Sequence, residues 1–168
     1  MKYDFQQILD EYNHQIYRTC RGFTGNDDDA KDLFQEVCIN IWSGLASFKG
    51  NSKMSTWIYR VTLNTCLFFR RSGLKQLKLA EYEADIQLTY QHENNPIDHQ
   101  IELLFNFIYE LKDQERAVIL LYLEQLSYAD ISEVTGLSVN HIGVKINRIK
   151  KNLASKFNKN GQLTINMD

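Results

Sequence analysis

The strongest chemical signal in the sequence is a run of basic side chains near its C-terminal end. Residues 139–162 carry six Lys or Arg and no Asp or Glu. Cations at this density bind phosphate, and side chains at the start of such a segment contact base edges in a major groove. We therefore predict a nucleic-acid-binding surface. Ser138 opens it, base-edge contacts are expected from Asn140, His141, Val144 and Lys145, and phosphate contacts are expected from Arg148 and Lys151.

Two helices joined by a tight turn are expected to hold these side chains. Ser127 and Asp130 have the spacing of a capping box, and Gly136 supplies the positive φ that such a turn requires. A second helix then begins at Ser138, and together these features predict a helix-turn-helix. An ordinary amphipathic helix with a solvated basic face is the alternative. The apolar arc of the second helix consists of Ile142, Ile146, Ile149 and Leu153.

A second polar and basic group surrounds the turn FKGNS at 48–52. The spacing of apolar residues predicts three helices, over 5–23, from 27 to about 48 and from about 52 to 73, packed as a compact bundle. Asp27 to Asp29 are expected to cap the second helix. The polar group therefore lies where the third helix begins.

Charge is unevenly distributed along the 168 residues, although the net charge is only −2. Residues 1–79 carry 11 basic and 8 acidic side chains. Residues 80–110 carry 7 acidic side chains and no basic one, and residues 111–168 carry 8 basic and 6 acidic side chains. This pattern predicts two modules that face polyanions, joined by an acidic linker. No apolar run approaches the roughly 20 residues that span a bilayer, so we expect a cytoplasmic protein without membrane insertion.

The predicted fold class is all-α, with two small helical domains. The N-terminal bundle is expected over 1–73, the acidic linker over 74–95, the helix-turn-helix domain over 96–160 and a tail over 161–168. Within the C-terminal domain, Pro96 marks a helix start and Asp113 is expected to cap the next helix.

The sequence offers no catalytic site, metal site or cofactor site. Asp27, Asp28 and Asp29 are the densest carboxylate cluster, but consecutive helical residues point in different directions, which is poor geometry for a two-metal nuclease. The four histidines lack ligand spacing, and no phosphate-binding glycine loop is present. We interpret the three cysteines as reduced, partly buried thiols, with a redox sensor as the alternative.

Several segments resemble the extracytoplasmic-function subfamily of sigma-70 RNA polymerase sigma factors. LKDQER at 111–116 and LSYADI at 126–131 resemble the entry into that family's promoter-reading helix-turn-helix. DAKDLFQEV at 29–37 is similar to the family's polymerase-docking helix. FKGNS, followed by TWIYRV at 56–61, resembles the segment that melts and reads the −10 element. The resemblance covers nearly the whole chain, in the right order.

The resemblance implies partners and site residues. It implies that Asp32, Gln35, Glu36 and Asn40 bind the clamp of bacterial core RNA polymerase, and that the C-terminal helix-turn-helix reads the −35 element of promoter DNA. It also implies an anti-sigma partner. The residues expected at the −10 element are Lys49, Asn51, Ser52, Lys53, Tyr59, Arg60, Asn64, Arg70 and Arg71. The first four surround a base pocket, Asn64 meets a base edge, and the others hold the strand.

Two departures from the family pattern bear on the promoter sequence. Gly143 interrupts the reading helix where the family often has a lysine, and Phe68 stands where the family is often acidic. Trp57 is either a stacking platform or part of the bundle core, and we favour the core. The acidic linker either threads a basic channel of polymerase or is a passive tether. The rival function is a stand-alone helix-turn-helix regulator whose N-terminal bundle senses a ligand or dimerises.

Overall fold

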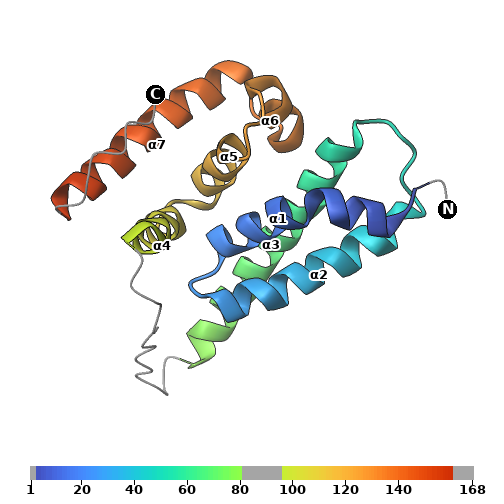
Figure 1. The fold of residues 1–168 in the computed structure, drawn as a ribbon, viewed down its shortest axis with the longest axis horizontal. Helices are drawn as coiled ribbons and strands as arrows, with labels where there is room; N and C mark the ends of the chain where they lie inside the picture. The colour runs from blue at the N-terminus through green and yellow to red at the C-terminus, as the bar shows by residue number, and fades with distance from the viewer. Residues whose placement is uncertain (1–2, 81–95, 161–168) are drawn as a thin grey trace.

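The computed structural model describes residues 3–80 and 96–160, and of residues 74–80 it describes the backbone only. Within that part the chain forms seven α-helices and no strand, which confirms the all-α prediction (Figure 1). The helices are α1 (Phe5–Phe23), α2 (Asp27–Leu45), α3 (Met54–Ala80), α4 (Pro96–Tyr109), α5 (Asp113–Leu123), α6 (Tyr128–Thr135) and α7 (Val139–Lys159).

Helices α1, α2 and α3 pack on one another as the N-terminal bundle. The cap of α2 differs by one residue from the sequence prediction. Asn26, not Asp27, accepts a hydrogen bond from the backbone N–H of Asp29, at 2.8 Å, and the three aspartates form the first helical turn. Carboxylates there face the positive end of the helix dipole, so they stabilise the helix start without capping it.

Helix α3 continues beyond the expected boundary at residue 73 and reaches Ala80. Gly73 does not end it, because a glycine inside a helix costs only about 1 kcal/mol relative to alanine. The rest of the predicted linker, residues 81–95, and the predicted tail, 161–168, lie outside the described residues.

Helices α4 to α7 form the C-terminal domain, and its turns follow the predicted chemistry with one exception. Ser127 and Asp130 form the expected capping box, with an N–H to Oγ distance of 3.1 Å, and Gly136 has a φ of 77°. The N-cap of α5 is Lys112, which makes no side-chain capping bond, so the prediction for Asp113 was wrong. Asp113 instead binds Arg116 and Arg70.

Arg116 connects α4 to α5 from a completely buried position. Its guanidinium donates to the backbone oxygens of Ile108, at 3.2 Å, and Leu111, at 2.6 Å, as well as to Tyr109 O, and pairs with Asp113 at 2.9 Å. Ile108 and Tyr109 belong to the last turn of α4 and Leu111 follows it, so the buried charge is held by carbonyls at the end of that helix and by the Asp113 carboxylate. Burial lowers the pKa of this guanidinium from its ordinary value.

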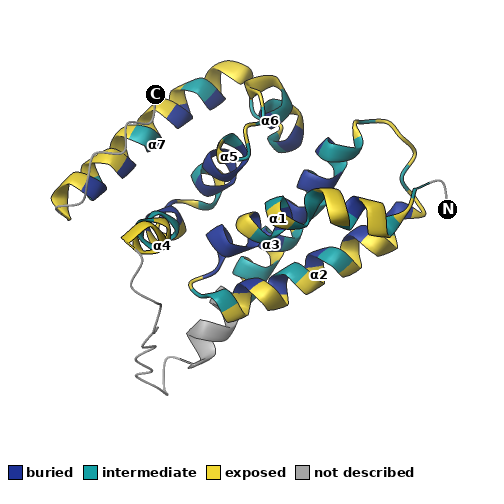
Figure 2. Cartoon of the chain, viewed as in Figure 1, coloured by how far each residue is buried: buried dark blue, intermediate teal, exposed yellow. Residues whose placement is uncertain are grey.

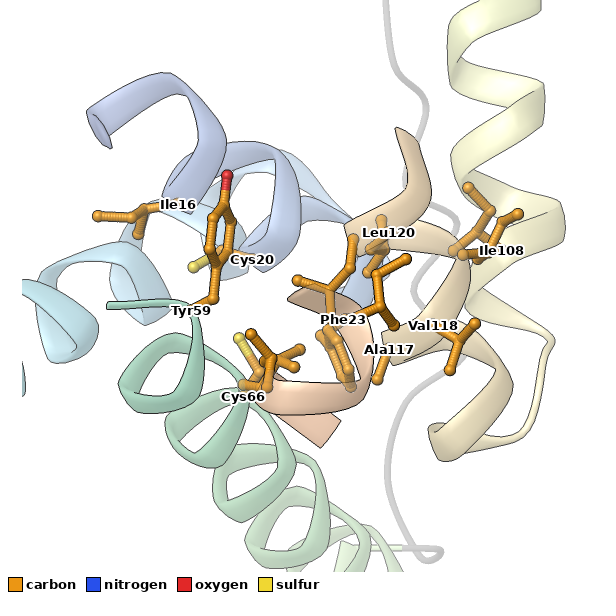
Figure 3. Close-up of a cluster of buried hydrophobic side chains, with 14 of the residues drawn as sticks. Ile16, Cys20, Phe23, Tyr59, Cys66, Ile108, Ala117, Val118 and Leu120 are labelled. Carbon is orange, nitrogen blue, oxygen red and sulfur yellow. The ribbon is translucent and has the colours of Figure 1, made fainter. Parts of the chain in front are cut away.

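The two halves of the chain pack against each other. Helix α1 contacts α4 and α5, helix α3 contacts α6, and α7 packs on α4, α5 and α6, on the side away from the N-terminal bundle (Figure 1). Figure 3 shows Phe23 of α1 among Ala117, Leu120 and Ile108, all of them buried. We refer to this contact region between α1–α3 and α4–α7 as the domain interface.

Candidate nucleic-acid and polymerase surfaces

Helix α7 presents one exposed face along its length. Asn140, Val144, Arg148 and Lys151 follow one another at steps of three or four residues and are all exposed, Val144 at 66%. The opposite face, from Ile142 to Phe157, is buried (Figure 2). The predicted contact residues on this exposed face thus form a short polar group at the N-terminal end of the helix and a pair of cations further along it.

The N-terminal end of α7 is the part that the sequence predicts to enter a major groove. The Ser138 hydroxyl caps the helix by accepting from the His141 N–H at 3.2 Å, and His141 itself is exposed. Lys145 differs from the other predicted contacts, because it is only 8% exposed and lies on the buried arc with Ile142 and Ile149. Its burial takes it out of the exposed contact face in this arrangement.

Arg148 has a protein partner that the sequence did not suggest. Its Nη2 donates to Glu115 Oε1 of α5 at 2.5 Å, and the Arg148 side chain is 64% exposed. The guanidinium must leave or share this carboxylate to bind a DNA phosphate. Glu115 is thus a competitor for any anionic ligand of Arg148.

The turn before α3 holds part of the second polar group. Lys49, Asn51 and Lys53 are exposed, and Gly50 has a φ of 75°, which bends the chain back on itself. Trp57 packs on Phe48, with ring centroids 5.1 Å apart. That packing supports the interpretation of Trp57 as part of the bundle. The turn thus packs on the aromatic rings of Phe48 and Trp57, and its polar side chains, Ser52 included, lie at or near the surface.

Other residues expected at the −10 element are in contact with the C-terminal domain. Arg60 donates to the backbone oxygen of Glu133 at 2.5 and 3.2 Å. Tyr59 is 5% exposed, and burial raises the pKa of its hydroxyl to about 12. Arg71 and Asn64 are exposed, and both line a pocket of about 300 Å³ between α3, α5 and α6. Two further pairs cross the same interface: Lys53 with Asp130 at 3.1 Å, and Arg70 with Asp113 at 2.7 Å.

The four residues expected to bind polymerase share one groove. Asp32, Gln35, Glu36 and Asn40 are exposed on α2 and line a groove of about 900 Å³ between α2 and α3. Asn40 Nδ2 donates to Thr65 Oγ1 of α3 at 3.0 Å. Apolar side chains of both helices also line the groove, among them Ile39 of α2 and Phe68 of α3, and Phe68 is 71% exposed. Acidic side chains beside exposed apolar ones suit a basic amphipathic segment of a partner.

The histidines, cysteines and carboxylates of residues 3–80 and 96–160 are the remaining groups that could hold a metal ion. No group of three His, Cys, Asp or Glu is placed to hold a metal ion there, and no helix is long and apolar enough to span a membrane. Cys20 and Cys66 are buried free thiols, and burial raises the pKa of the Cys66 thiol. Cys38 is half-buried, and the same cause raises its pKa to about 11.

Comparison with known proteins matches this architecture. Residues 8–74 match the family model of sigma-70 region 2, and residues 102–153 match that of sigma-70 region 4. Among curated relatives, the ECF RNA polymerase sigma factor SigW of Bacillus subtilis is 32% identical over 165 residues, which cover 91% of this chain and 88% of SigW. The RNA polymerase sigma factor YlaC of the same organism is 28% identical over 160 residues, covering 92% of this chain and 90% of YlaC.

Solved structures share the fold at low sequence identity. The sigma factor RpoE of Bartonella quintana, in complex with the anti-sigma factor NepR, superposes with a TM-score of 0.74 at 18% identity, over 90% of this chain and 95% of that one. CnrH, in complex with the cytosolic domain of CnrY, superposes with a TM-score of 0.68 at 18% identity, over 92% of this chain and 88% of CnrH. The matched regions, the identity to SigW and the exposed helix-turn-helix agree with one another, and the chain belongs to the ECF RNA polymerase sigma factors, which direct promoter-specific initiation of transcription.

Proposed function

We propose that this sigma factor divides promoter recognition between its two halves, with the residues assigned above. The α7 face of Ser138, Asn140, His141 and Val144 reads base edges of the −35 duplex, while Arg148 and Lys151 hold phosphates. The observation that carries this assignment is the continuous exposed face of α7, which begins at a capped helix N-terminus and continues into cations. Helix N-termini and cations both favour phosphate, so they fix the position of the helix in the groove.

The N-terminal bundle captures the single-stranded −10 element in this proposal. Opening a duplex costs about 1.4 kcal/mol per base-pair step, so the single strand must gain contacts that the duplex does not offer. The exposed turn residues Lys49, Asn51, Ser52 and Lys53 surround a base pocket, and Asn64 offers both a donor and an acceptor. Arg60, Arg70 and Arg71 hold the strand backbone, and Tyr59 joins them once it is uncovered.

The α2–α3 groove binds core RNA polymerase. Its acidic rim, formed by Asp32 and Glu36, attracts basic side chains of the polymerase clamp, and Gln35 and Asn40 add hydrogen bonds. This chain binds and positions promoter DNA and polymerase, and the polymerase catalyses phosphoryl transfer. We therefore expect the chain to have no enzymatic activity of its own. We place the protein in the cytoplasm, where promoter DNA and polymerase are found.

An anti-sigma protein is the expected regulatory partner. The structural neighbour RpoE is solved in complex with the anti-sigma factor NepR, and CnrH is solved in complex with the cytosolic domain of CnrY. A helix of the partner can cover the α2–α3 groove, which is lined by Phe68 and Ile39. Such a partner would compete with polymerase for the same residues.

Transcription from a promoter library by purified bacterial core polymerase, with and without this protein, tests the proposal. Specific transcription start sites that depend on the protein would give the −10 and −35 sequences directly. Binding to duplex DNA by the protein alone, without any transcription start site, would instead favour the stand-alone regulator. A pull-down with core polymerase separates an inactive pairing of sigma factor and polymerase from a chain that does not bind polymerase at all.

A further inference from the structure

The exposed face of α7 has an apolar side chain at its centre. Val144 is 66% exposed, whereas Ile142, two residues earlier, is completely buried. At 100° per residue the two side chains stand about 200° apart around the helix, so they point in nearly opposite directions. Val144 therefore points away from the core of the C-terminal domain, on the exposed face of α7 that Figure 2 shows.

Polar side chains surround Val144 on this face. Asn140 and His141 lie one turn before it and are exposed. Asn147 and Arg148 lie one turn after it and are exposed as well. Helix propensity does not account for the valine, because a side chain branched at Cβ is a weaker helix former than alanine or a straight chain. Neither burial within this chain nor helix formation thus explains an apolar side chain at this position.

The helix backbone next to Val144 is open to close approach. Gly143 carries no side chain, and the ring of Tyr128 from α6 lies beside the place where one would begin, with its Cε2 atom 3.4 Å from the position of a Cβ at Gly143. Valine is short, so it reaches a ligand only where the backbone around it can come close. A glycine at position 143 permits that approach, whereas a long side chain would hold the ligand away.

The major groove of DNA offers one apolar group to such a side chain. Adenine, guanine and cytosine present hydrogen-bond donors and acceptors there, whereas thymine presents its C5 methyl group beside one acceptor. Valine has neither donor nor acceptor. Against the other bases it would remove polar atoms from water without giving them a partner, which is unfavourable. Against thymine it buries one methyl group on another.

Building on the proposed role of α7 at the −35 element, we propose that Val144 selects a thymine in that element through contact with the 5-methyl group. Asn140 and Arg148, one turn to either side, hold the helix in the groove around this contact by hydrogen bonds to a base edge and to a phosphate. The chain thus reads one position of the −35 element with an apolar group rather than with a hydrogen bond.

Replacing thymine by uracil tests the proposal at a single methyl group. 2′-Deoxyuridine keeps the Watson–Crick pair and the O4 acceptor of thymidine but lacks the methyl group. A set of −35 duplexes, taken from a promoter found by transcription with core polymerase, carries this replacement at one thymine at a time, on either strand. Fluorescence anisotropy measures the affinity of the full-length protein for each duplex.

One of these replacements is expected to weaken binding of the wild type about fourfold, which is the effect of losing one buried methyl group. In Val144→Ala the same replacement should have no measurable effect, because alanine is too short to reach the methyl group. Such coupling between the two changes is the signature of direct contact, since changes at separate sites act independently. Val144 is exposed and alanine favours a helix, so α7 is expected to remain folded in this variant.

Val139→Ala is the matched control. Val139 is also an exposed valine of α7, at 46%, but it lies five residues before Val144 and thus about 140° away around the helix. This variant should keep the full sensitivity to the thymine replacement, whatever its own affinity for the duplex.

A wild-type affinity that no thymine replacement changes would overturn the proposal. An equal loss in the wild type and in Val144→Ala would overturn it too, as would a −35 element that contains no thymine on either strand. The proposed function has separate measures, namely the preference of the wild type for the −35 duplex over a scrambled duplex and transcription with core polymerase. Both can succeed while no methyl group matters, so a failure of this contact is distinguishable from a failure of the proposed function.

Discussion

Arg148 offers a quantitative test of the −35 surface. Its guanidinium is exposed on the reading face of α7 and is bound to Glu115 at 2.5 Å in the free protein. We expect Arg148→Ala to weaken binding to a −35 duplex and to flatten the salt dependence of that binding. The size of both effects follows from the fact that the arginine exchanges one anionic partner for another.

A charge-assisted hydrogen bond contributes about 1.5–3 kcal/mol, and an exposed ion pair that must be given up removes up to about 1 kcal/mol of that gain. The net contribution of about 1 kcal/mol corresponds to roughly a fivefold loss of affinity at low salt. One phosphate contact contributes about 0.9 to the slope of log affinity against log salt. Between roughly 50 and 200 mM salt, the advantage of the wild type should therefore shrink by about 3.5-fold.

Fluorescence anisotropy with the −35 duplex at several salt concentrations measures both quantities. Glu115→Gln is the complementary variant: it releases Arg148 from its carboxylate and should raise affinity about two- to fivefold, and it should have no such effect when Arg148 is already alanine. A salt slope that is the same in the wild type and Arg148→Ala would refute the phosphate assignment. An equal gain from Glu115→Gln in both backgrounds would refute the exchange of partners.

Three further predictions follow from the buried arginine, the polymerase groove and the half-buried thiol. Arg116→Met should lower the free energy of unfolding in urea by about 3–5 kcal/mol, because the carbonyls at the end of α4 lose their donors; a loss below about 1 kcal/mol would contradict the role given to this side chain. Asp32→Ala combined with Gln35→Ala should weaken binding to core polymerase about tenfold in a pull-down titration while leaving the helical circular dichroism intact, and unchanged affinity would reject the groove assignment. Cys38, whose pKa burial raises to about 11 from an ordinary 9.0, holds less thiolate at pH 8. Its alkylation there should be roughly 100-fold slower than that of a free thiol and should quicken toward pH 11, whereas labelling at the rate of a free thiol would contradict its burial.

The helix-turn-helix could be predicted from the sequence because its determinants are local. Ser127 and Asp130 lie three residues apart and bond to each other, and Gly136 takes up the positive φ that the turn needs. The two capping errors, at Asp27 and Asp113, are each displaced by one residue from the true cap. Asn26 has the same capping chemistry as its neighbour Asp27, whereas Lys112 makes no side-chain capping bond at all, so the pattern of capping residues alone does not decide which residue adopts the non-helical backbone.

At Lys145 the charge pattern and the helical spacing point in different directions. It lies three residues after Ile142 and four before Ile149, which places it on the buried arc at 100° per residue. Its charge predicts a DNA contact, whereas its position predicts burial of the side-chain stem, and the structure shows the side chain buried. Val144 and Arg148, four residues apart, are both exposed, as the same argument requires.

The domain interface had no comparable signal in the sequence. Arg18 and Glu124 are 106 positions apart, and Lys53 and Asp130 are 77 apart. Each of these residues is typical of a solvated helix face, and nothing near it specifies a distant partner. Gly22 is similar, since a glycine near the end of a helix is common, and only the position of Leu120 explains why a side chain does not fit.

Helix α3 joins the three binding surfaces of the molecule. Asn64 lines both the α2–α3 groove and the pocket toward α5 and α6, and Arg60 and Arg70 on the same helix contact the C-terminal domain. Substitutions on α3 are therefore expected to change the proposed polymerase binding, the proposed strand capture and the packing of the two domains together, and a loss of transcription from such a variant does not identify the surface responsible. Arg18 and Gly22 lie on α1 and outside the proposed DNA and polymerase residues. Variants at these two positions are expected to change the packing of the two domains alone, so they separate the three contributions that α3 combines.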